Sequence, residues 1–426
     1  MMLLSGLWLT ILLLGMPIAL TLGVAALIYM WWNGMPLVII PQRMVGGIDS
    51  FPLLAVPFFI LAGNLMNSSG VTDRIFRFSH ALIGHVRGGL AHVNVVASII
   101  FSGMSGSAVA DAGGLGAMEI KAMREAGYKP AFAGAVTIAS CIIGPLIPPS
   151  IPMVIYGVLA DASIGRLFLG GVVPGLMTGG ALMIMISLMA RRRNFPVEPK
   201  MTWSEARGAT REALLPLLTP FIIIGGIVFG VFSPTEAAVI ASFYALILGT
   251  LVYRQLGLRE LRDVFLRSGR TTASICFIVA TATVFAWVLA SLRVPQTAAE
   301  WLTGITRDPL MLLLIVNLAV FIAGFFLEGL AIMILVVPVM TPTMALIGID
   351  PVHFGVVLVF NLMIGLMTPP MGIGLFVVSS VAGVRLEDLV REVFPFLVPL
   401  LIVLLLLILF PPLVTWLPNL MLGVAR

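Results

Sequence analysis

The stretch GPLIPPS at residues 144–150 interrupts a long hydrophobic run, and GLMTPPM at residues 365–371 interrupts another in the same way. Proline lacks the amide hydrogen that a helix needs and clashes with the preceding turn, so each Pro–Pro pair must break its helix. Inside a hydrocarbon layer an unpaired backbone polar group is costly, and a break survives only where it is buried or lines a cavity. If the surrounding runs are membrane helices, the two stretches predict two functional breaks within them.

The two stretches belong to an internal repeat with a constant offset of 221 residues (365 − 144). One or two matching glycines or prolines would mean little in this chain, but seven matches in register indicate a duplicated unit. The pairs are Gly103 with Gly324, Pro130 with Pro351, Gly134 with Gly355, Gly144 with Gly365, Pro148 with Pro369, Pro149 with Pro370, and Pro174 with Pro395.

The composition is that of a membrane protein. Of the 426 residues, 60% are hydrophobic and 10% are charged, and the mean hydropathy is +1.13. Soluble domains carry about 25% charged residues. Apolar runs of about 18 residues or more, each able to cross a hydrocarbon layer, recur from end to end. The runs are continuous rather than alternating, which excludes a β-barrel. The sequence therefore predicts an all-α polytopic membrane protein.

Several function classes are disfavoured by the same composition. Residues 1–32 are typical of a membrane helix rather than a cleaved signal peptide. The net charge of +5 is spread over short loops, as the positive-inside rule requires, and does not indicate a nucleic-acid partner. Cys141 and Cys276 lie in apolar surroundings and suggest packing rather than a disulfide. The chain has no phosphate-binding loop motif, so we expect no ATP hydrolysis and no enzymatic activity.

Basic residues predict how the two copies are oriented. The segment from Gly88 to Ile120 is too interrupted for two full crossings and predicts a re-entrant helical hairpin. Clusters of arginine and lysine flank it on both sides, which places both flanks in the cytoplasm. The equivalent segment, 309–345, has no basic cluster and is expected to enter from the opposite face. Inverted repeats of this kind are typical of secondary transporters. The flanking residues are Arg74, Arg77, Arg87, Lys121, Arg124 and Lys129 in the first copy, and Arg307, Asp308 and Asp350 in the second.

The rest of the chain is expected to form a static part. Two helices, about 217–233 and 235–253, are joined by the FSPTEAA turn at 232–238 and lie between two strongly basic loops. Amphipathic segments at 72–87, 291–307 and 385–394 are too charged to span and suit the membrane interface. The predicted divisions are N-terminal scaffold helices and first arm, 1–87; first transport half, 88–158; scaffold helices, linkers and second arm, 159–308; second transport half, 309–384; and C-terminal arm and scaffold helix, 385–426.

The predicted binding chemistry follows from the breaks and the hairpin tips. Carbonyls freed at the breaks, with a hydroxyl from Ser150 or Thr368, suit a hard cation such as sodium. The first tip, FSGMSGSAVADAGG at 101–114, offers hydroxyls and amides that suit an anion. The second tip, GFFLEGL at 324–330, has no serine, so the first copy is expected to hold the solute. Asp111 either contacts the solute or braces the hairpin, and Glu328 is a second intramembrane acid.

Together these segments resemble the large (M) membrane subunit of tripartite ATP-independent periplasmic (TRAP) transporters. The resemblance covers essentially the whole chain. It is carried by IDSFPLLAVPFFILAGNLM (48–66), FSGMSGSAVADAGGLGAMEIKAM (101–123), IGPLIPPSIPMVIYG (143–157), PGLMTGG (174–180), FSPTEAA (232–238) and GLMTPPMGIGLFV (365–377).

The resemblance implies a sodium-driven elevator transporter in the bacterial inner membrane. It implies two protein partners, a small four-helix membrane subunit and a periplasmic solute-binding protein. It also implies an organic-acid solute such as a C4-dicarboxylate, sialic acid or another sugar acid. Carried over by position, the first sodium site comprises Ser102, Gly103, Ser105, Gly144, Ile147 and Pro149; the second comprises Gly324, Gly365, Thr368 and Met371; and the solute site comprises Ser105, Ser107, Asp111 and Ser150.

Two other classes of function are weighed against this one. A stand-alone sodium-coupled anion transporter, or a sodium/proton antiporter of related hairpin architecture, would need neither partner protein. A channel or a purely structural scaffold is disfavoured, because neither needs paired carbonyl sites inside the membrane.

Overall fold

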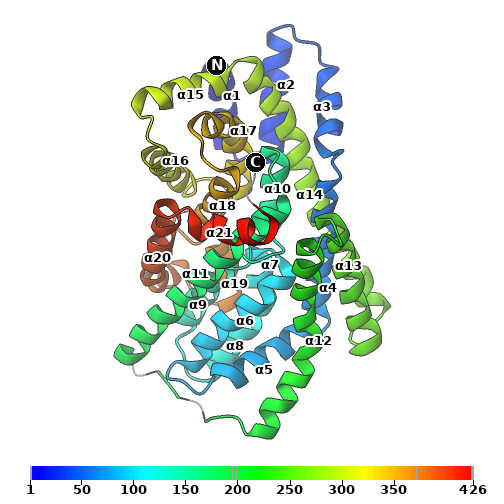
Figure 1. The fold of residues 1–426 in the computed structure, drawn as a ribbon, viewed down its shortest axis with the longest axis vertical. Coiled ribbons are helices and arrows are strands. Elements are labelled where there is room, and N and C mark those ends of the chain that lie inside the picture. Colours follow the sequence, from blue (N-terminus) through cyan, green and yellow to red (C-terminus); the bar gives the residue numbers. More distant parts are fainter. Residues whose placement is uncertain (1, 194, 198, 371, 424–426) are drawn as a thin grey trace.

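The computed structural model describes residues 2–193, 195–197, 199–370 and 372–423. Within these residues every regular element is helical (Figure 1). The first half of the chain contains α1 (Met2–Leu13), α2 (Ile18–Trp32), α3 (Ile39–Ile48), the 3₁₀ turn η1 (Pro52–Leu54), α4 (Ala55–Ser68), α5 (Val71–Ile83), α6 (Gly89–Ser105), α7 (Ala108–Gly113), α8 (Leu115–Glu125), α9 (Pro130–Cys141), α10 (Ile151–Ala160) and α11 (Ile164–Arg193).

The second half repeats this order of helices. It contains α12 (Trp203–Val228), α13 (Pro234–Ile247) with the π-helical turn η2 (Leu248–Val252), α14 (Leu258–Ser291), α15 (Val294–Ile305), α16 (Pro309–Ala323), α17 (Gly329–Ile347), α18 (Pro351–Leu366), α19 (Ile373–Ala382), α20 (Leu386–Leu409) and α21 (Pro412–Leu422).

Helix boundaries confirm the duplication. The offset of 221 residues places the start of α9, Pro130, on the start of α18, Pro351. It also places the start of α7, Ala108, on the start of α17, Gly329. Proline fixes its own φ and suits the first turn of a helix, so Pro130 and Pro351 define these starts in the same way.

Each copy contains a helical hairpin, as predicted. The first hairpin consists of α6 followed by α7 and α8, and the second consists of α16 and α17. At the first tip, Gly106 adopts a φ of +65°, and Ser107 then caps α7 by accepting a hydrogen bond from the Ala110 amide at 3.4 Å. Helices α5 and α8 lie at one end of the molecule and α15 and α16 at the other, so the hairpins enter from opposite ends (Figure 1). The copies are therefore inverted.

Each hairpin packs beside a broken helix. The first broken helix is α9 with α10 and the second is α18 with α19; the Pro148–Pro149 and Pro369–Pro370 bonds within them are both cis. Buried amides tie each hairpin to the broken helix of its own copy. Asn94 donates to Thr137 Oγ1 at 2.8 Å and accepts from Ser140 at 2.6 Å. Asn361 donates to the Asn317 carbonyl at 2.7 Å.

The broken helices of the two copies also pack against each other. The Tyr156 ring of α10 meets the Phe354 ring of α18 edge-on, with centroids 6.3 Å apart. The Tyr156 hydroxyl donates to the Pro351 carbonyl at 2.6 Å. Gly355 leaves the space for this ring, because a Cβ there would overlap it. Cross-copy packing of this kind makes the hairpins and broken helices one unit.

The helices fall into two groups that lie side by side (Figure 1). The scaffold unit comprises α1–α4 and α12–α14, in which α14 packs on α2, α3 and α4, and α4 packs on α13. The hairpin unit comprises α6–α11 and α16–α21, with α5 and α15 as arms. Two segments that we predicted as scaffold pack on the hairpin unit instead: α11, from 159–308, packs on α6 and α18, and α20, from 385–426, packs on α9 and α18. Helix α21 packs on α11.

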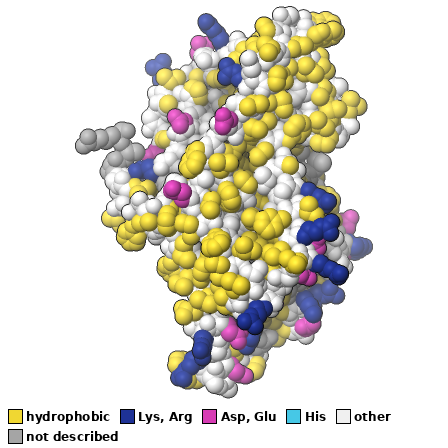
Figure 2. All heavy atoms as spheres, turned by 90° about the vertical axis from the view of Figure 1, so that its right-hand side faces the viewer, with side chains coloured by type: hydrophobic (Ala, Val, Ile, Leu, Met, Phe, Trp, Pro, Cys, Tyr) yellow, Lys and Arg dark blue, Asp and Glu magenta, His cyan; other side chains and the backbone are white. Residues whose placement is uncertain are grey.

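The surface suits a bilayer. Among the described residues, six helices are long and apolar enough to cross a membrane, or eight if the bent pairs α3–α4 (64°) and α15–α16 (120°) each count as one span. Hydrophobic side chains cover most of the scaffold side of the molecule (Figure 2). Buried polar side chains occur in both units, and those of the hairpin unit include Asn94, Ser102 and Ser150 near the first hairpin and break.

We expect Gly355→Ala to destabilise the protein by about 1–3 kcal/mol, because the added methyl group must displace the Tyr156 ring from a packed site. Thermal unfolding of purified protein measures the effect. Gly208→Ala is the matched control, since Gly208 lies within α12 and a Cβ there meets no atom within 4 Å. Equal stability of the two variants would contradict the tight crossing of α10 and α18.

Candidate functional site

A cavity of about 490 Å³ lies where the hairpin unit meets the scaffold unit. Both hairpin tips reach it, through Ser105–Ala110 in the first copy and Glu328–Leu330 in the second. The first break contributes Pro145, and the scaffold contributes residues from α4 and α14. A cavity bounded by both copies and both units is the candidate solute site.

The first tip places hydroxyls in this cavity. Ser105 and Ser107, which we predicted for the solute site, both line it. The tip reaches the scaffold closely, since a Cβ on Gly63 of α4 would lie 3.1 Å from Ser105 Cα. It also reaches the break closely, since the Ile151 amide donates to the Gly106 carbonyl at 3.3 Å. Glycine at both points permits this approach of backbone to backbone.

The first break has oxygens available for a cation. Within the described part of the chain, the carbonyls of Gly144, Ile147 and Pro149 accept no hydrogen bond. Ser102 is fully buried, and its hydroxyl donates to the Ile99 carbonyl at 2.6 Å, which leaves its lone pairs free. The Ile147 side chain packs against Gly175 of α11, so this residue can contribute only its carbonyl. Carbonyl and hydroxyl oxygens are the ligands that hard cations prefer.

Two predicted solute residues lie behind the cavity wall. Asp111 is 2% exposed, and its Oδ2 lies 2.7 Å from where a Gly144 Cβ would be, so it faces the break. Its Oδ1 has no hydrogen-bond partner among the described residues. Ser150 is fully buried; it donates to the Pro145 carbonyl at 2.5 Å and accepts from the Met153 amide at 3.2 Å, which caps α10. Neither side chain lines the cavity.

The second break is more fully hydrogen-bonded than the first. Gly324 and Gly365 meet backbone to backbone, with a Gly324 Cβ position 3.4 Å from Gly365 Cα. The Gly365 carbonyl accepts from the Thr368 amide at 3.1 Å, and the Thr368 carbonyl accepts from the Gly372 amide at 3.2 Å. The Thr368 hydroxyl donates to the Ile364 carbonyl at 2.7 Å. Met371, the remaining predicted ligand, lies outside the described residues.

The cavity wall includes polar residues that the sequence analysis missed. Asn64 of α4 and Thr271 and Ser274 of α14 line it from the scaffold side. Asn64 is the one amide within the apolar motif at 48–66, a signal that sequence reasoning could have used. The α14 hydroxyls give no such signal, because helical serines and threonines commonly bond to their own backbone.

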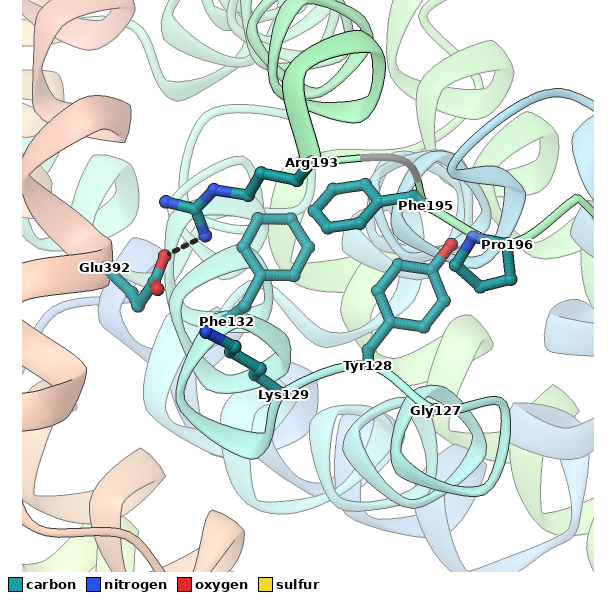
Figure 3. Close-up of a pocket in the computed structure, with 8 residues that line it drawn as sticks. All are labelled: Gly127, Tyr128, Lys129, Phe132, Arg193, Phe195, Pro196 and Glu392. Carbon is teal, nitrogen blue, oxygen red and sulfur yellow. Dashed lines mark hydrogen bonds and ion pairs between the residues drawn. The ribbon is translucent and has the colours of Figure 1, made fainter.

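A second cavity, of about 500 Å³, lies at the end of α11, away from both breaks (Figure 3). Arg193 forms an ion pair with Glu392 at 2.6 Å across it, and its guanidinium lies over the Phe132 ring. Phe195 packs on Phe132, with ring centroids 4.7 Å apart, and on Tyr128 at 5.1 Å. This cluster fixes the segment after α11 to the hairpin unit and is structural.

Comparison with known proteins agrees with the fold and with the family resemblance seen in the sequence. Residues 6–413 match the family described as "Tripartite ATP-independent periplasmic transporter, DctM component". The chain is 50% identical over 417 residues to the sialic acid TRAP transporter large permease protein SiaM of Vibrio cholerae, covering 98% of each chain. It is 41% identical over 371 residues to the C4-dicarboxylate TRAP transporter large permease protein DctM of Pseudomonas aeruginosa, covering 87% of each.

The fold also resembles that of the YdaH transporter of Alcanivorax borkumensis, with a TM-score of 0.64 at 16% identity over 87% of this chain and 88% of that one. At this identity the likeness concerns the fold alone. The family match and the two permeases extend over nearly the whole length of the chain. The chain therefore belongs to the DctM component family of tripartite ATP-independent periplasmic transporters.

Proposed function

We propose that this chain is the large permease subunit of a sodium-driven importer of an organic acid. In this proposal the solute arrives from a periplasmic binding protein, and a small four-helix membrane subunit completes the complex in the inner membrane. The hairpin unit carries the solute across the membrane by moving against the scaffold unit. The observation that carries the proposal is the cavity where both hairpin tips meet the scaffold.

An organic acid fits the composition of the cavity wall. Ser105 and Ser107 offer hydroxyl groups to a carboxylate or to sugar hydroxyls, and the rest of the wall is mostly apolar apart from the polar side chains of α4 and α14 and the carboxyl group of Glu328. Binding through neutral donors gives the modest affinity that a transporter needs in order to release its solute. The two permeases compared above are named for sialic acid and for C4-dicarboxylates, which are both acids of this class.

Sodium fits the oxygens at the first break. Unpaired carbonyls at Gly144, Ile147 and Pro149 lie behind the first hairpin tip with the hydroxyls of Ser102 and Ser105. Asp111 faces the same break, and we assign it to the cation side rather than to the solute. A cation there would compensate its buried charge and hold the tip that lines the solute cavity. At the second site, the oxygens of Gly365 and Thr368 already accept or donate one hydrogen bond, whereas the Gly324 carbonyl accepts none among the described residues.

Movement of the hairpin unit fits the way the units are joined. The arms α5 and α15 each contact both units. We place α11 in the moving unit, because it packs on α6, α18, α20 and α21. The contact between α11 and α12 then lies on the boundary: a Gly165 Cβ would be 3.2 Å from Cγ2 of Ile227.

Reconstitution tests the proposed function directly. Proteoliposomes containing this chain and its small-subunit partner should take up sialic acid or succinate only with the binding protein outside and an inward sodium gradient. Uptake that ignores sodium would overturn the coupling. Uptake that persists without the binding protein would instead favour a stand-alone anion transporter.

Hydroxyl removal tests the two sodium sites. We expect Ser105→Ala and Thr368→Ala each to raise the sodium concentration for half-maximal uptake about 5- to 30-fold, the equivalent of losing one ligand worth about 1–2 kcal/mol. Thr178→Ala is the control, because Thr178 is buried and donates to its own helix at Pro174, as Thr368 does at Ile364. If both test variants kept the sodium dependence of the unmodified complex, Ser105 and Thr368 would not be sodium ligands.

A reversible cross-link tests the movement. With Cys141 and Cys276 replaced by alanine, a disulfide between Gly165→Cys and Ile227→Cys should stop uptake, and reduction should restore it, because it joins the two units. The control pair, Gly23→Cys and Thr281→Cys, lies within the scaffold unit, where the Cβ atoms would be 3.6 Å apart. Continued uptake with the first pair fully oxidised is incompatible with an elevator.

A further inference from the structure

We propose that α14 supplies a fixed polar wall that contacts the solute's carboxylate and passes it towards Arg267 on release. The wall consists of Thr271 and Ser274, supported by Asn64 of α4. This inference rests on the proposed function and assigns a part of the solute site to the scaffold unit, which does not carry the hairpins.

Helix geometry shows that the wall is one face of α14. Thr271, Ser274, Ile275 and Ile278 all line the cavity, with the spacing i, i+3, i+4 and i+7 of a single helix face. Thr271 and Ser274 are exposed, and both line the cavity. The hydroxyls now donate to the carbonyls of Arg267 and Arg270 at 3.1 and 3.0 Å, and a hydroxyl can rotate to donate to a carboxylate instead.

A hydrogen bond fixes the wall in position. Asn64 Nδ2 donates to Ser268 Oγ at 2.9 Å, which joins α4 to α14 beside the cavity. Ser268 is itself 5% exposed, and the bond is partly buried. The first hairpin tip lies against the same part of α4, at Gly63. A solute held by Ser105 and Ser107 therefore faces this wall across the cavity.

Arg267 continues the same face of α14 beyond the cavity. It precedes Thr271 by four residues, which places it about one turn, or ~6 Å, along the helix. Its guanidinium donates to Ser68 Oγ at 3.4 Å and to the Asp263 carbonyl at 3.3 Å. None of the ion pairs within 4 Å among the described residues involves Arg267. Its charge is thus available to an anion leaving the cavity.

The position of Arg267 fits release rather than capture. It lies towards the basic loop that precedes α14, which the positive-inside rule places in the cytoplasm. As the hairpin unit moves past α14, the carboxylate would exchange hydroxyl donors on the wall and then meet the guanidinium. The wall would then set the affinity for the acid, and Arg267 would set the rate of turnover. Neither would affect sodium binding.

Uptake by the complete complex separates these effects. With sialic acid and succinate as probes, we expect Thr271→Val with Ser274→Ala to raise the solute KM about 5- to 10-fold, the loss of one or two hydrogen bonds. Arg267→Gln should lower the maximal rate by a similar factor. The sodium concentration for half-maximal uptake should not change. Matched controls are Thr272→Val and Arg262→Gln, which lie on other faces of α14.

Cysteine labelling provides a readout that does not depend on transport. In a background with Cys141 and Cys276 replaced by alanine, Ser274→Cys should react with an anionic methanethiosulfonate, and saturating solute should slow the reaction at least about fivefold. If the unmodified complex transports, but solute does not slow the labelling of Ser274→Cys and the test variants have the same KM and maximal rate as the controls, this inference alone is overturned. Failure of the unmodified complex to take up either acid overturns the proposed function and this inference with it.

Discussion

The structure depends on one constraint: backbone polar groups released inside a hydrocarbon layer must be covered or used. Two breaks release them, between α9 and α10 and between α18 and α19. Each break is covered by a hairpin tip at backbone distance, through Gly106 beside Pro149 in the first copy and Gly324 beside Gly365 in the second. A side chain at these glycines would separate tip from break. The hairpins are therefore held where the breaks need cover, and the cavity forms beside them.

Both copies cover their break with a hairpin tip, but they differ in the polar groups that they place there. The first break keeps unpaired carbonyls and a tip rich in hydroxyls, whereas the carbonyls of Gly365 and Thr368 already accept amides and the second tip presents Glu328. The scaffolding interactions are retained in both copies: Asn94 and Asn317 each tie a hairpin to its own broken helix. Structural requirements are thus met symmetrically, while the polar chemistry is concentrated in one copy.

The sequence predicted the course of the backbone well, but it predicted fewer of the side chains that face the cavity. Proline and glycine act locally, so the breaks, the hairpins, the repeat and its inversion could all be read from residue types and spacing. Asp111 shows the limit. Its residue type marked it as functional, but its direction, towards Gly144 rather than the cavity, depends on packing between α7 and the first break. Thr271 and Ser274 were missed because the residues that share the cavity with them from other helices lie more than 50 residues away in sequence.

A departure from the repeat explains why the scaffold wall lies on α14. Its counterpart in the first copy is the pair α3 and α4, which bends by 64° around Pro52, whereas the matching position in α14 is Ala273. Alanine favours a helix, so α14 continues unbroken for 34 residues, or about 51 Å, which exceeds a ~30 Å hydrocarbon layer. One helix face can therefore run from the cavity out to the basic loop, carrying hydroxyls at one level and Arg267 at the next. A break would turn these groups out of line, so the continuity of α14 is what makes a path for an anion possible on the fixed side of the protein.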